Sequence, residues 1–530
     1  MSTQFRPLEI PAGVVAKPTK NQRSSNWAEV HLMRWVESKM SPVGGQSQYK
    51  FTFASRCKRI HGFFDLVQIY HIAFLCEQHL YVLTGGTLTD VTPVDGIAAP
   101  NNPNVGGYGD SFYNDYTYGT PRTISPIAAL DKAPSAYSLD NFGSILYAMT
   151  SADGRLLMWN PAVGGPAAVQ VADVGRGQVP LGRCFVVTNE RYIMIFGTAN
   201  DGTVEEGKQN RFAWCDQENP GAWDYTNVTS QAGFLDIEPA SPIICAHATR
   251  NGIIIFTAKK AYNSTYQGMP YIYNYVEIGT NCTPWSPQSI SSTSSMMVWM
   301  SKQGMFSFDG TSILPMNCLV RPWVDGDIDL LQVREQACMV HVGDFNEVWW
   351  FFPQDGQTKN TRCIYYSYKE GWWGMGRMGR TAGITSSYTA HTIMADDLVA
   401  YQHEVPYAYP ANVDLPWAET FDLNLNPGLL TTVKQLIPDI SGAVANVLYS
   451  LFYRTSRSLS VDYSGNVIPA LEAQTSPKQV RNNGYVDFRT TGRDIRLKIE
   501  VGAPPGQPRP DVRPVTVGQH LIDSVARGDR

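Results

Sequence analysis

The chain has 530 residues, of which 43% are hydrophobic and 17% charged, and this composition excludes an intrinsically disordered protein. The formal net charge of −5 provides no overall basic field that would hold nucleic acid. So few charges, together with 12% aromatic residues, favour a subunit of an assembly over a free monomer.

The N-terminal region is basic, unlike the rest of the chain. Residues 1–60 contain ten lysines and arginines and three glutamates. We expect residues 1–55 to form a basic arm with a first strand; the segment from Asn26 to Lys39 fits either a helix or alternating strands. The arm would dock on an acidic partner subunit, contact DNA phosphates or remain solvated. The candidate docking residues are Arg23, Trp27, Arg34, Trp35, Arg56, Lys58 and Arg59.

Residues 56–404 repeat one pattern of short apolar strands joined by turns that contain Gly or Asp-Gly. A small sheet cannot bury both of its faces alone, whereas sheets stacked around an axis can. We therefore predict an all-β fold, a β-propeller of about six blades, with five or seven also compatible. The repeating units are residues 57–93, 138–161, 183–225, 242–268, 294–316 and 337–376.

Three further segments differ from the repeats. Residues 96–122 are rich in Gly, Asn and Tyr, which predicts an exposed insertion. Residues 405–502 contain longer strands, and DIRLKIEV at 494–501 alternates strictly, so we predict a small C-terminal antiparallel β-domain. Residues 503–530 form a Pro-rich tail, which we expect to be extended unless it docks on a neighbour.

No sequence signal points to export, metal binding or a cofactor. Residues 1–13 lack the apolar core of a signal peptide, and no apolar stretch approaches the roughly 20 residues that span a bilayer. The nine cysteines form no CxxC pair and lie mostly in apolar runs, which predicts buried free thiols in a reducing cytosol.

Catalytic motifs are missing too: the sequence contains no nucleophile elbow, no HExxH and no P-loop. Propeller glycosidases need paired carboxylates. The one sialidase-like turn, residues 151–159, departs from the SxDxGxxW pattern and does not recur, so we expect an ordinary hairpin. The acidic stretch of Asp325, Asp327 and Asp329 is expected to be a solvated loop, with a cation site as the lesser alternative.

Two other groups of residues are candidates for a role. Glu335 and Asp344 are candidates to face the propeller axis, although their spacing does not pair them. Trp372 and Trp373, with nearby tyrosines, would either pack in the core or form a platform that stacks on a sugar.

Both ends of the chain carry motifs that occur together in one family of viral proteins. The opening has IPAGV at 10–14, then a strand from Trp27 to Trp35 and a Gly-Gly turn at 44–45. The closing motifs are FDLNLNPGLLTTVKQLIPDISG at 421–442, FYRTSR at 452–457 and FRTTGRDIRLKIEV at 488–501. In these segments the chain resembles the packaged-DNA stabilisation proteins, which form the tail nozzle (tail accessory factor) of short-tailed bacteriophages.

The resemblance implies a structural role without catalysis or a small-molecule substrate. Six copies would form a homo-hexameric ring below the portal and the head-to-tail adaptor ring. That ring would extend the DNA channel, retain the packaged genome without sequence-specific binding and attach a needle, fibres or tailspikes. The protein would reside in the virion tail after assembly in the host bacterial cytoplasm. The alternatives are a carbohydrate-binding propeller of a host-recognition structure and, third, a propeller glycosidase.

Overall fold

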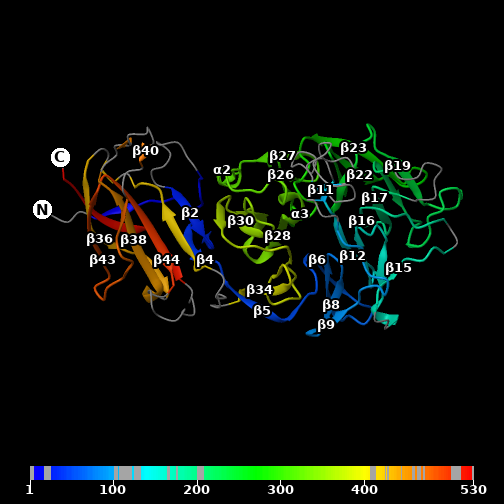
Figure 1. Cartoon of the computed structure of the whole chain (residues 1–530), viewed down its shortest axis with the longest axis horizontal. Coiled ribbons are helices and arrows are strands. Elements are labelled where there is room, and N and C mark those ends of the chain that lie inside the picture. The colour runs from blue at the N-terminus through cyan, green and yellow to red at the C-terminus, as the bar shows by residue number, and fades with distance from the viewer. Residues whose placement is uncertain are drawn as a thin grey trace.

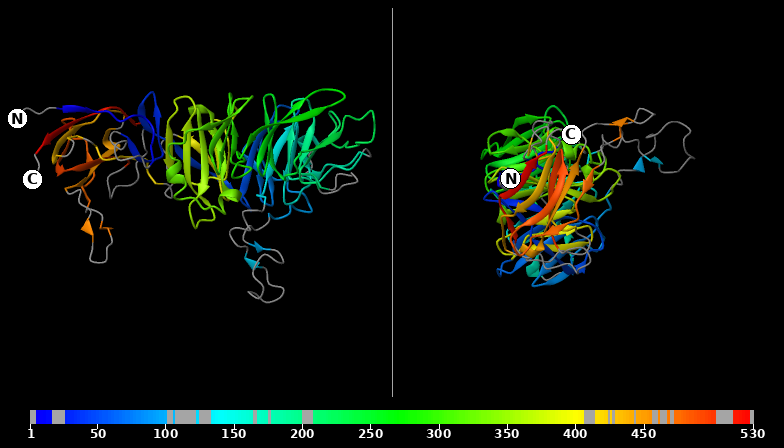
Figure 2. Two further views of the ribbon diagram at one scale, coloured as in Figure 1. Left: turned by 90° about the horizontal axis from the view of Figure 1, so that it is seen from above. Right: turned by 90° about the vertical axis from the view of Figure 1, so that its left-hand side faces the viewer.

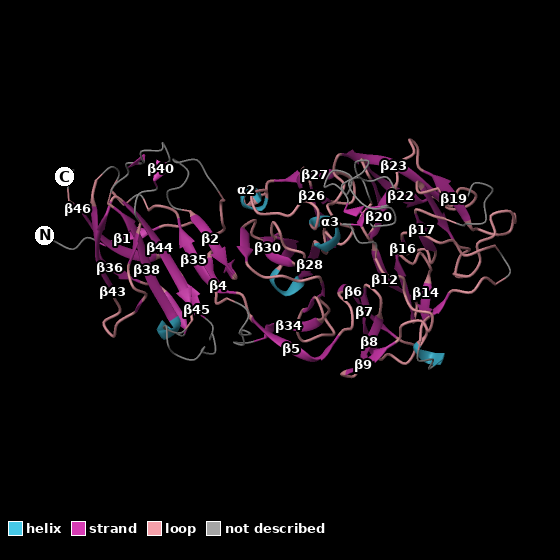
Figure 3. Ribbon diagram, in the orientation of Figure 1, coloured by secondary structure: helices cyan, strands magenta, loops and turns pink. Residues whose placement is uncertain are grey.

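The regular secondary structure of the computed structural model consists almost entirely of strands, which pair in antiparallel fashion (Figure 3). It forms a β-propeller and a β-sandwich side by side, with both chain ends at the sandwich (Figure 1). The described residues are 5–16, 26–100, 105–106, 122–123, 133–163, 167–174, 177–199, 208–405, 414–423, 425–426, 429–442, 444–455, 460–461, 467–468, 472–502 and 515–527.

The propeller has seven four-stranded blades, one more than the six that we expected from the repeats. Blade 1 contains β6 (Cys57–Phe64), β7 (Tyr70–Cys76), β8 (Leu80–Thr84) and β9 (Thr87–Asp90). Blade 2 contains β12 (Tyr137–Phe142), β13 (Ile145–Thr150), β14 (Leu157–Trp159) and β15 (Val169–Gln170). Blade 3 contains β16 (Cys184–Val187), β17 (Ile193–Phe196), β18 (Arg211–Trp214) and β19 (Gly233–Asp236). Blade 4 contains β20 (Ile243–Thr249), β21 (Gly252–Thr257), β22 (Lys260–Tyr266) and β23 (Tyr273–Thr280). Blade 5 contains β24 (Ile290–Ser292), β25 (Met297–Ser301), β26 (Gly304–Phe308) and β27 (Ile313–Met316). Blade 6 contains β28 (Cys338–Val342), β29 (Glu347–Pro353), β30 (Asn360–Ser367) and β31 (Trp373–Gly376). Each of these six blades contains one of the six predicted units, but the predicted units omit strands such as β19, β23 and β24.

The seventh blade is assembled from two distant parts of the chain. Strands β32 (Ala382–Ile384), β33 (Ile393–Asp396) and β34 (Val399–Val405) are completed by β5 (Gly45–Thr52) as the outermost strand. The inner strand β32 contacts both β28 and β6, which closes the ring of blades. Pairing of β5 with β34 thus ties the N-terminal region to the end of the propeller.

The blades pack face to face through apolar strands. All seven residues of β29 are buried, as its sequence EVWWFFP suggests for a strand between two neighbouring blades. At the tip of the β8–β9 hairpin, Gly85 and Gly86 have φ values of 56° and 90°, a conformation that glycine adopts without steric cost.

The sandwich contains three sheets and joins both ends of the chain. The first has the order β1 (Phe5–Leu8), β46 (His520–Ala526), β36 (Thr431–Ile437), β43 (Val486–Gly492). The second has the order β2 (Trp27–His31), β35 (Trp417–Thr420), β44 (Asp494–Val501), β38 (Val447–Arg454), with β41 (Ala473–Gln474) and β42 (Lys478–Gln479) both paired to β38. The third has the order β3 (Met33–Val36), β4 (Lys39–Pro42), β45 (Val515–Val517), β37 (Ile440–Gly442). The predicted alternation of DIRLKIEV is confirmed, because every second side chain of β44 is buried.

These sheets correct the predicted domain boundaries. Residues 1–55 are not a separate arm: β1 to β4 belong to the sandwich and β5 to the propeller. The sandwich also extends beyond 405–502, since β45 and β46 come from the predicted Pro-rich tail, of which 503–514 lie outside the described residues. The segment 26–39 forms strands, which resolves that ambiguity.

The remaining elements are short. They are α2 (Arg321–Val324), α3 (Val333–Gln336), η1 (Pro161–Val163), η2 (Gly343–Phe345) and η3 (Val444–Asn446). The paired strands β10 (Val105–Gly106) and β11 (Arg122–Thr123), and likewise β39 (Ser460–Val461) and β40 (Val467–Ile468), lie away from the body on the same side (Figure 2). Most of the predicted insertion at 96–122 lies outside the described residues. No helix among the described residues is long and apolar enough to cross a membrane.

Candidate functional site

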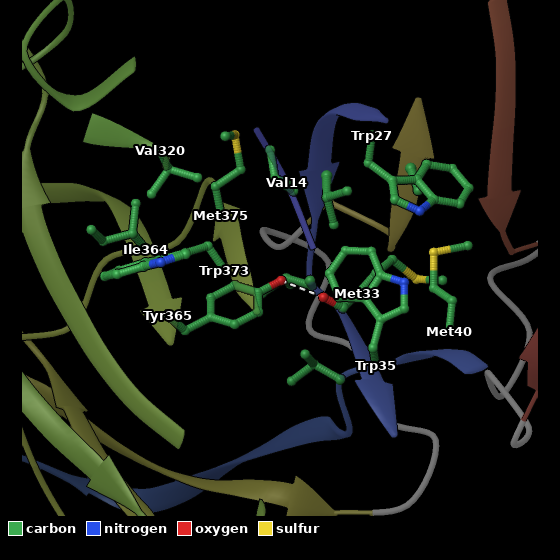
Figure 4. Close-up of a cluster of buried hydrophobic side chains, with 14 of the residues drawn as sticks. Val14, Trp27, Met33, Trp35, Met40, Val320, Ile364, Tyr365, Trp373 and Met375 are labelled. Carbon is green, nitrogen blue, oxygen red and sulfur yellow. Dashed lines mark hydrogen bonds between the residues drawn. The ribbon is translucent and has the colours of Figure 1, made fainter. Parts of the chain in front are cut away.

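The predicted docking tryptophans lie inside the junction between sandwich and propeller (Figure 4). Trp27 and Trp35 are 5% and 3% exposed. The Trp35 ring packs edge-on against Trp372 at 5.3 Å, and the Tyr365 hydroxyl of β30 donates a 2.6 Å hydrogen bond to the Met33 carbonyl. The prediction that these tryptophans dock a partner is therefore wrong, because burial within the chain leaves them no surface to present.

The IPAGV segment, residues 10–14, runs through this junction. The Val14 N–H donates to the Trp373 carbonyl at 2.8 Å, and the Ala16 N–H donates to the Leu319 carbonyl at 3.0 Å. Gly13 has φ of 91°, and a Cβ at this position would lie 2.9 Å from the Trp372 Cβ. Both the positive φ and the close approach require glycine. The IPAGV motif therefore has a structural role, because it joins the sandwich to the propeller.

Arg34 is the centre of a buried ion cluster at the same junction. Its guanidinium lies 2.9 Å from Glu347 Oε1 of β29 and 2.6 Å from Glu404 Oε1 of β34. The Trp349 indole N–H donates to Glu347 Oε2 at 2.8 Å. Burial raises the pKa of the Glu347 carboxyl, against the opposing attraction of Arg34. Arg34 thus connects β3 of the sandwich to two blades. The prediction that Arg34 docks a partner is therefore wrong.

Arg56 and Lys58 are also used within the chain. Arg56 Nε donates to Asp397 Oδ1 at 2.6 Å, and Lys58 Nζ donates to the Glu335 carbonyl at 3.0 Å. Both side chains also bind the Gln336 amide oxygen. Burial lowers the pKa of Lys58. These contacts correct the predicted docking role of the two residues, while Arg23 lies outside the described residues.

Helix α3 closes one end of the propeller axis. Glu335, in the connection between blades 5 and 6, accepts the Ser135 N–H of the segment before blade 2 at 3.1 and 3.2 Å. Gln288, just before blade 5, donates to the Tyr137 carbonyl of blade 2 at 3.1 Å. Because these blades lie on opposite sides of the ring, both contacts cross the axis. The expectation that Glu335 faces the axis is confirmed.

Glu335→Gln is expected to lower the free energy of unfolding by about 1 kcal/mol, because the amide keeps one acceptor oxygen for the Ser135 N–H but loses the charge that strengthens this hydrogen bond. The carboxylate accepts the Ser135 N–H with both oxygens and lies close to Lys58. Urea unfolding measures the change. The control is Glu370→Gln, whose carboxylate accepts the Glu37 N–H at 3.1 Å in an exposed setting. If the two substitutions lowered the free energy of unfolding equally, the conclusion that α3 closes the propeller axis through Glu335 would be contradicted.

An axial pocket of about 260 Å³ lies between the inner strands of blades 1 to 5. Arg59 and His61 of β6, Asp140 of β12 and His247 of β20 contribute its ionisable groups. His61 Nε2 lies 2.8 Å from the Asn141 amide oxygen and 3.7 Å from Asp140 Oδ1. Burial and the nearby Arg59 lower the pKa of His247 to about 3, so it is neutral at physiological pH. Sequence reasoning named Arg59 as a docking residue and missed the pocket, because the residues that line the pocket come from separate blades.

The pocket has one carboxylate among its described lining residues, Asp140. A glycosidase needs two carboxyl groups about 5–9.5 Å apart across the scissile bond. This pocket therefore lacks the arrangement that the third sequence hypothesis requires.

The acidic stretch at 325–329 is occupied by internal contacts. Asp327 Oδ2 pairs with Arg362 at 2.8 Å, and Asp325 pairs with Arg321 at 3.2 Å. Asp329 Oδ1 accepts the N–H groups of Leu331 and Gln332, both at 2.9 Å. Among the described residues, no group of three His, Cys, Asp or Glu side chains is placed to hold a metal ion.

The other sequence candidates have structural roles. In the 151–159 turn, Asp153 pairs with Arg155. Trp372 and Trp373 are 5% and 2% exposed, so the hypothesis of a sugar platform at these residues is wrong. All nine cysteines are free and eight are buried, as predicted, and burial raises the pKa of Cys184 to about 11.

An exposed apolar surface lies at the tips of blades 1 and 7. Leu66, Val67 and Tyr388 are 73%, 72% and 67% exposed. The Tyr388 ring packs edge-on against Phe64 at 4.6 Å. Asp65 Oδ1 accepts the N–H groups of Val67 and Ile69 at 2.9 and 2.8 Å, which fixes the hairpin that presents these side chains. Contiguous apolar side chains held in this way are typical of protein–protein contacts.

No protein-family model and no curated protein matches the sequence. Similar solved structures include YCF48 from Cyanidioschyzon merolae, with 11% identity and a TM-score of 0.35 over 68% of this chain and 99% of that chain. They also include the AfRom2 CNH domain, with 10% identity and a TM-score of 0.28 over 54% of this chain and 90% of that one. A mutant of Trypanosoma rangeli sialidase displaying trans-sialidase activity has 8% identity and a TM-score of 0.28 over 73% and 90%. At these identities the likeness concerns the fold and carries nothing about function.

Proposed function

We propose that this chain is a non-enzymatic structural subunit of a nozzle ring in the tail of a short-tailed bacteriophage. One observation carries the proposal: the segments that resemble the nozzle family, near 10–45 and 421–501, come together in the fold. They form the sandwich and its junction with the propeller. These segments lie about 400 residues apart in the sequence, yet they build one folded unit. This supports the view that the whole unit, and not only the separate motifs, resembles the nozzle family.

The arrangement of the two domains suits a ring subunit. Sandwich and propeller share one continuous core, so the chain is a stiff body that transmits load without bending at a linker. Duplex DNA cannot pass through the propeller, because α3 and Gln288 close an axis that leaves only about 260 Å³. In this proposal the DNA channel runs between about six copies, and the apolar surface around Leu66 and Tyr388 is one place for contact with another subunit.

The proposal predicts that particles assembled without this chain fill with DNA and then lose it. Infections that lack the protein are expected to yield mostly heads whose genome is DNase-sensitive. Particles that lack only fibres or tailspikes are the matched control, and they should keep their DNA protected. Stable, DNase-resistant DNA in particles without this chain would contradict a role in genome retention.

A further inference from the structure

Arg59 carries a charge that no salt bridge or side-chain hydrogen bond pairs among the described residues. Its guanidinium lines the axial pocket, yet among the described residues no carboxylate oxygen lies within 4.0 Å of it and no side-chain hydrogen bond engages it. Asp140, the carboxylate in the pocket wall, instead accepts the Asn141 N–H at 2.8 Å and lies beside His61. Arg59 therefore has no salt-bridge partner in the pocket, although the Asp140 carboxylate attracts it at longer range.

Arg59 is only partly exposed to solvent at its place in the pocket wall. Burial lowers the pKa of Arg59, yet a guanidinium keeps its proton throughout the physiological range. An unpaired charge removed from water is costly, and folded proteins normally pair such groups. His247 is neutral and brings no compensating charge. A solvent-borne anion in the pocket would supply the close pairing that Asp140 does not provide.

The pocket wall also supplies groups that suit an anion. Ser138 Oγ accepts the Phe185 N–H at 3.3 Å, which leaves its own hydroxyl proton free to donate to a ligand. Ser292 also lines the pocket. A volume of about 260 Å³ is smaller than the roughly 300–1,000 Å³ of typical ligand pockets, so the ligand has few heavy atoms.

We propose that the axial pocket binds one small oxyanion, held by Arg59 with help from Ser138. The chemical class is phosphate, sulfate or the carboxylate of a small organic acid. The site is independent of ring assembly, because every residue that forms it belongs to one chain.

The test is isothermal titration of the full chain with sodium phosphate, sodium sulfate or sodium acetate, in Tris chloride at constant ionic strength. We expect one site per chain, and the phosphate and sulfate arms distinguish tetrahedral anions from the carboxylate arm. Arg59→Gln should weaken binding about tenfold or more, since it removes the charge that holds the anion. Arg250→Gln is the matched control, at an exposed position on the β20–β21 hairpin, and should bind as the wild type does.

Thermal unfolding separates binding from a purely structural role of Arg59. In chloride alone, Arg59→Gln should melt at or above the wild-type temperature, because it removes an unpaired charge. Addition of the bound anion should raise the melting temperature of the wild type and of Arg250→Gln, but not that of Arg59→Gln. A variant that fails to fold or melts well below the wild type in chloride would overturn the proposal. So would a wild type that binds none of the three anions, or that binds a neutral monosaccharide instead.

Discussion

Arg34→Met is expected to lower the free energy of unfolding by about 3–5 kcal/mol, the cost of removing one partner from a buried ion cluster. The substitution keeps most of the side-chain volume but leaves Glu347 and Glu404 without their cation. The side chain of Glu347 is 1% exposed and has no access to solvent that could compensate. Urea unfolding measures the decrease in the free energy of unfolding. Tryptophan fluorescence is a suitable probe, because the Trp349 indole N–H donates directly to Glu347 at the cluster.

Arg377→Met is the control at the same junction. Arg377 pairs with Glu29 of β2 at 3.0 Å, but the two side chains are 46% and 36% exposed. Solvent screens such a pair, so its loss should cost about 0–1 kcal/mol. If Arg34→Met cost no more than Arg377→Met, the buried cluster would not be what fastens the sandwich to the propeller.

Acid should destabilise the protein steeply below about pH 6.5. Burial lowers the pKa values of His31 and His520 to about 4 and that of His247 to about 3, from an ordinary value near 6.5. As pH falls from 6.5 towards 4, the unfolded chain takes up these protons and the folded chain does not, so the free energy of unfolding decreases. Each histidine contributes about 1.4 kcal/mol per pH unit, or about 4 for all three. The raised pKa of Glu347 acts in the opposite direction.

Substitution of one histidine isolates this effect. His520 is 3% exposed, and its Nδ1 accepts the Asp439 N–H at 3.1 Å, a contact that glutamine can also make. His520→Gln should therefore fold and should flatten the pH dependence by about 1.4 kcal/mol per pH unit between pH 6 and 5. His391→Gln, at a partly exposed position, is the matched control. The same slope in wild type and His520→Gln, from urea unfolding at several pH values, would contradict the assignment.

The sequence predicted the propeller because each of the first six blades is contiguous in the chain. A strand, a Gly-containing turn and a returning strand recur within about 40 residues, so the pattern is visible by reading along the chain. The seventh blade is not contiguous: β5 pairs with β34 across about 350 residues, for example Ser47 with Gln402. No local periodicity records such a pairing, which is why the blade count was one too low.

The predicted docking site failed for a related reason. The surplus of positive charge in residues 1–60 can be read from the sequence composition. Which carboxylates form ion pairs with these charges depends on the fold. Arg34 finds its carboxylates 313 and 370 positions away, and Arg56 finds Asp397 341 positions away. Once these pairs form, Arg34 and Arg56 are neutralised inside the molecule, whereas Arg6, Lys39 and Lys50 remain exposed on its surface. Arg59 became a candidate site only when the fold placed it in the axial pocket.

The same long-range pairing explains the revised domain boundaries. The proline-rich composition after Ala503 predicts an extended tail, but β46 pairs with both β1 and β36. Leu8 opposes His520 in this pairing, so the first and last described strands of the chain are neighbours. Propensity alone favours a strand over 520–526 only weakly, and the partner strands from elsewhere in the chain provide the stabilisation.

Electron microscopy of the purified protein, alone and mixed with heads that carry the portal and adaptor rings but lack this chain, tests the ring-subunit proposal most directly. The account predicts closed rings of about six copies, free in solution or seated at the portal vertex, with the propellers and sandwiches at fixed relative positions in every subunit. Single two-lobed particles in both samples, with the head vertices unchanged, would contradict it.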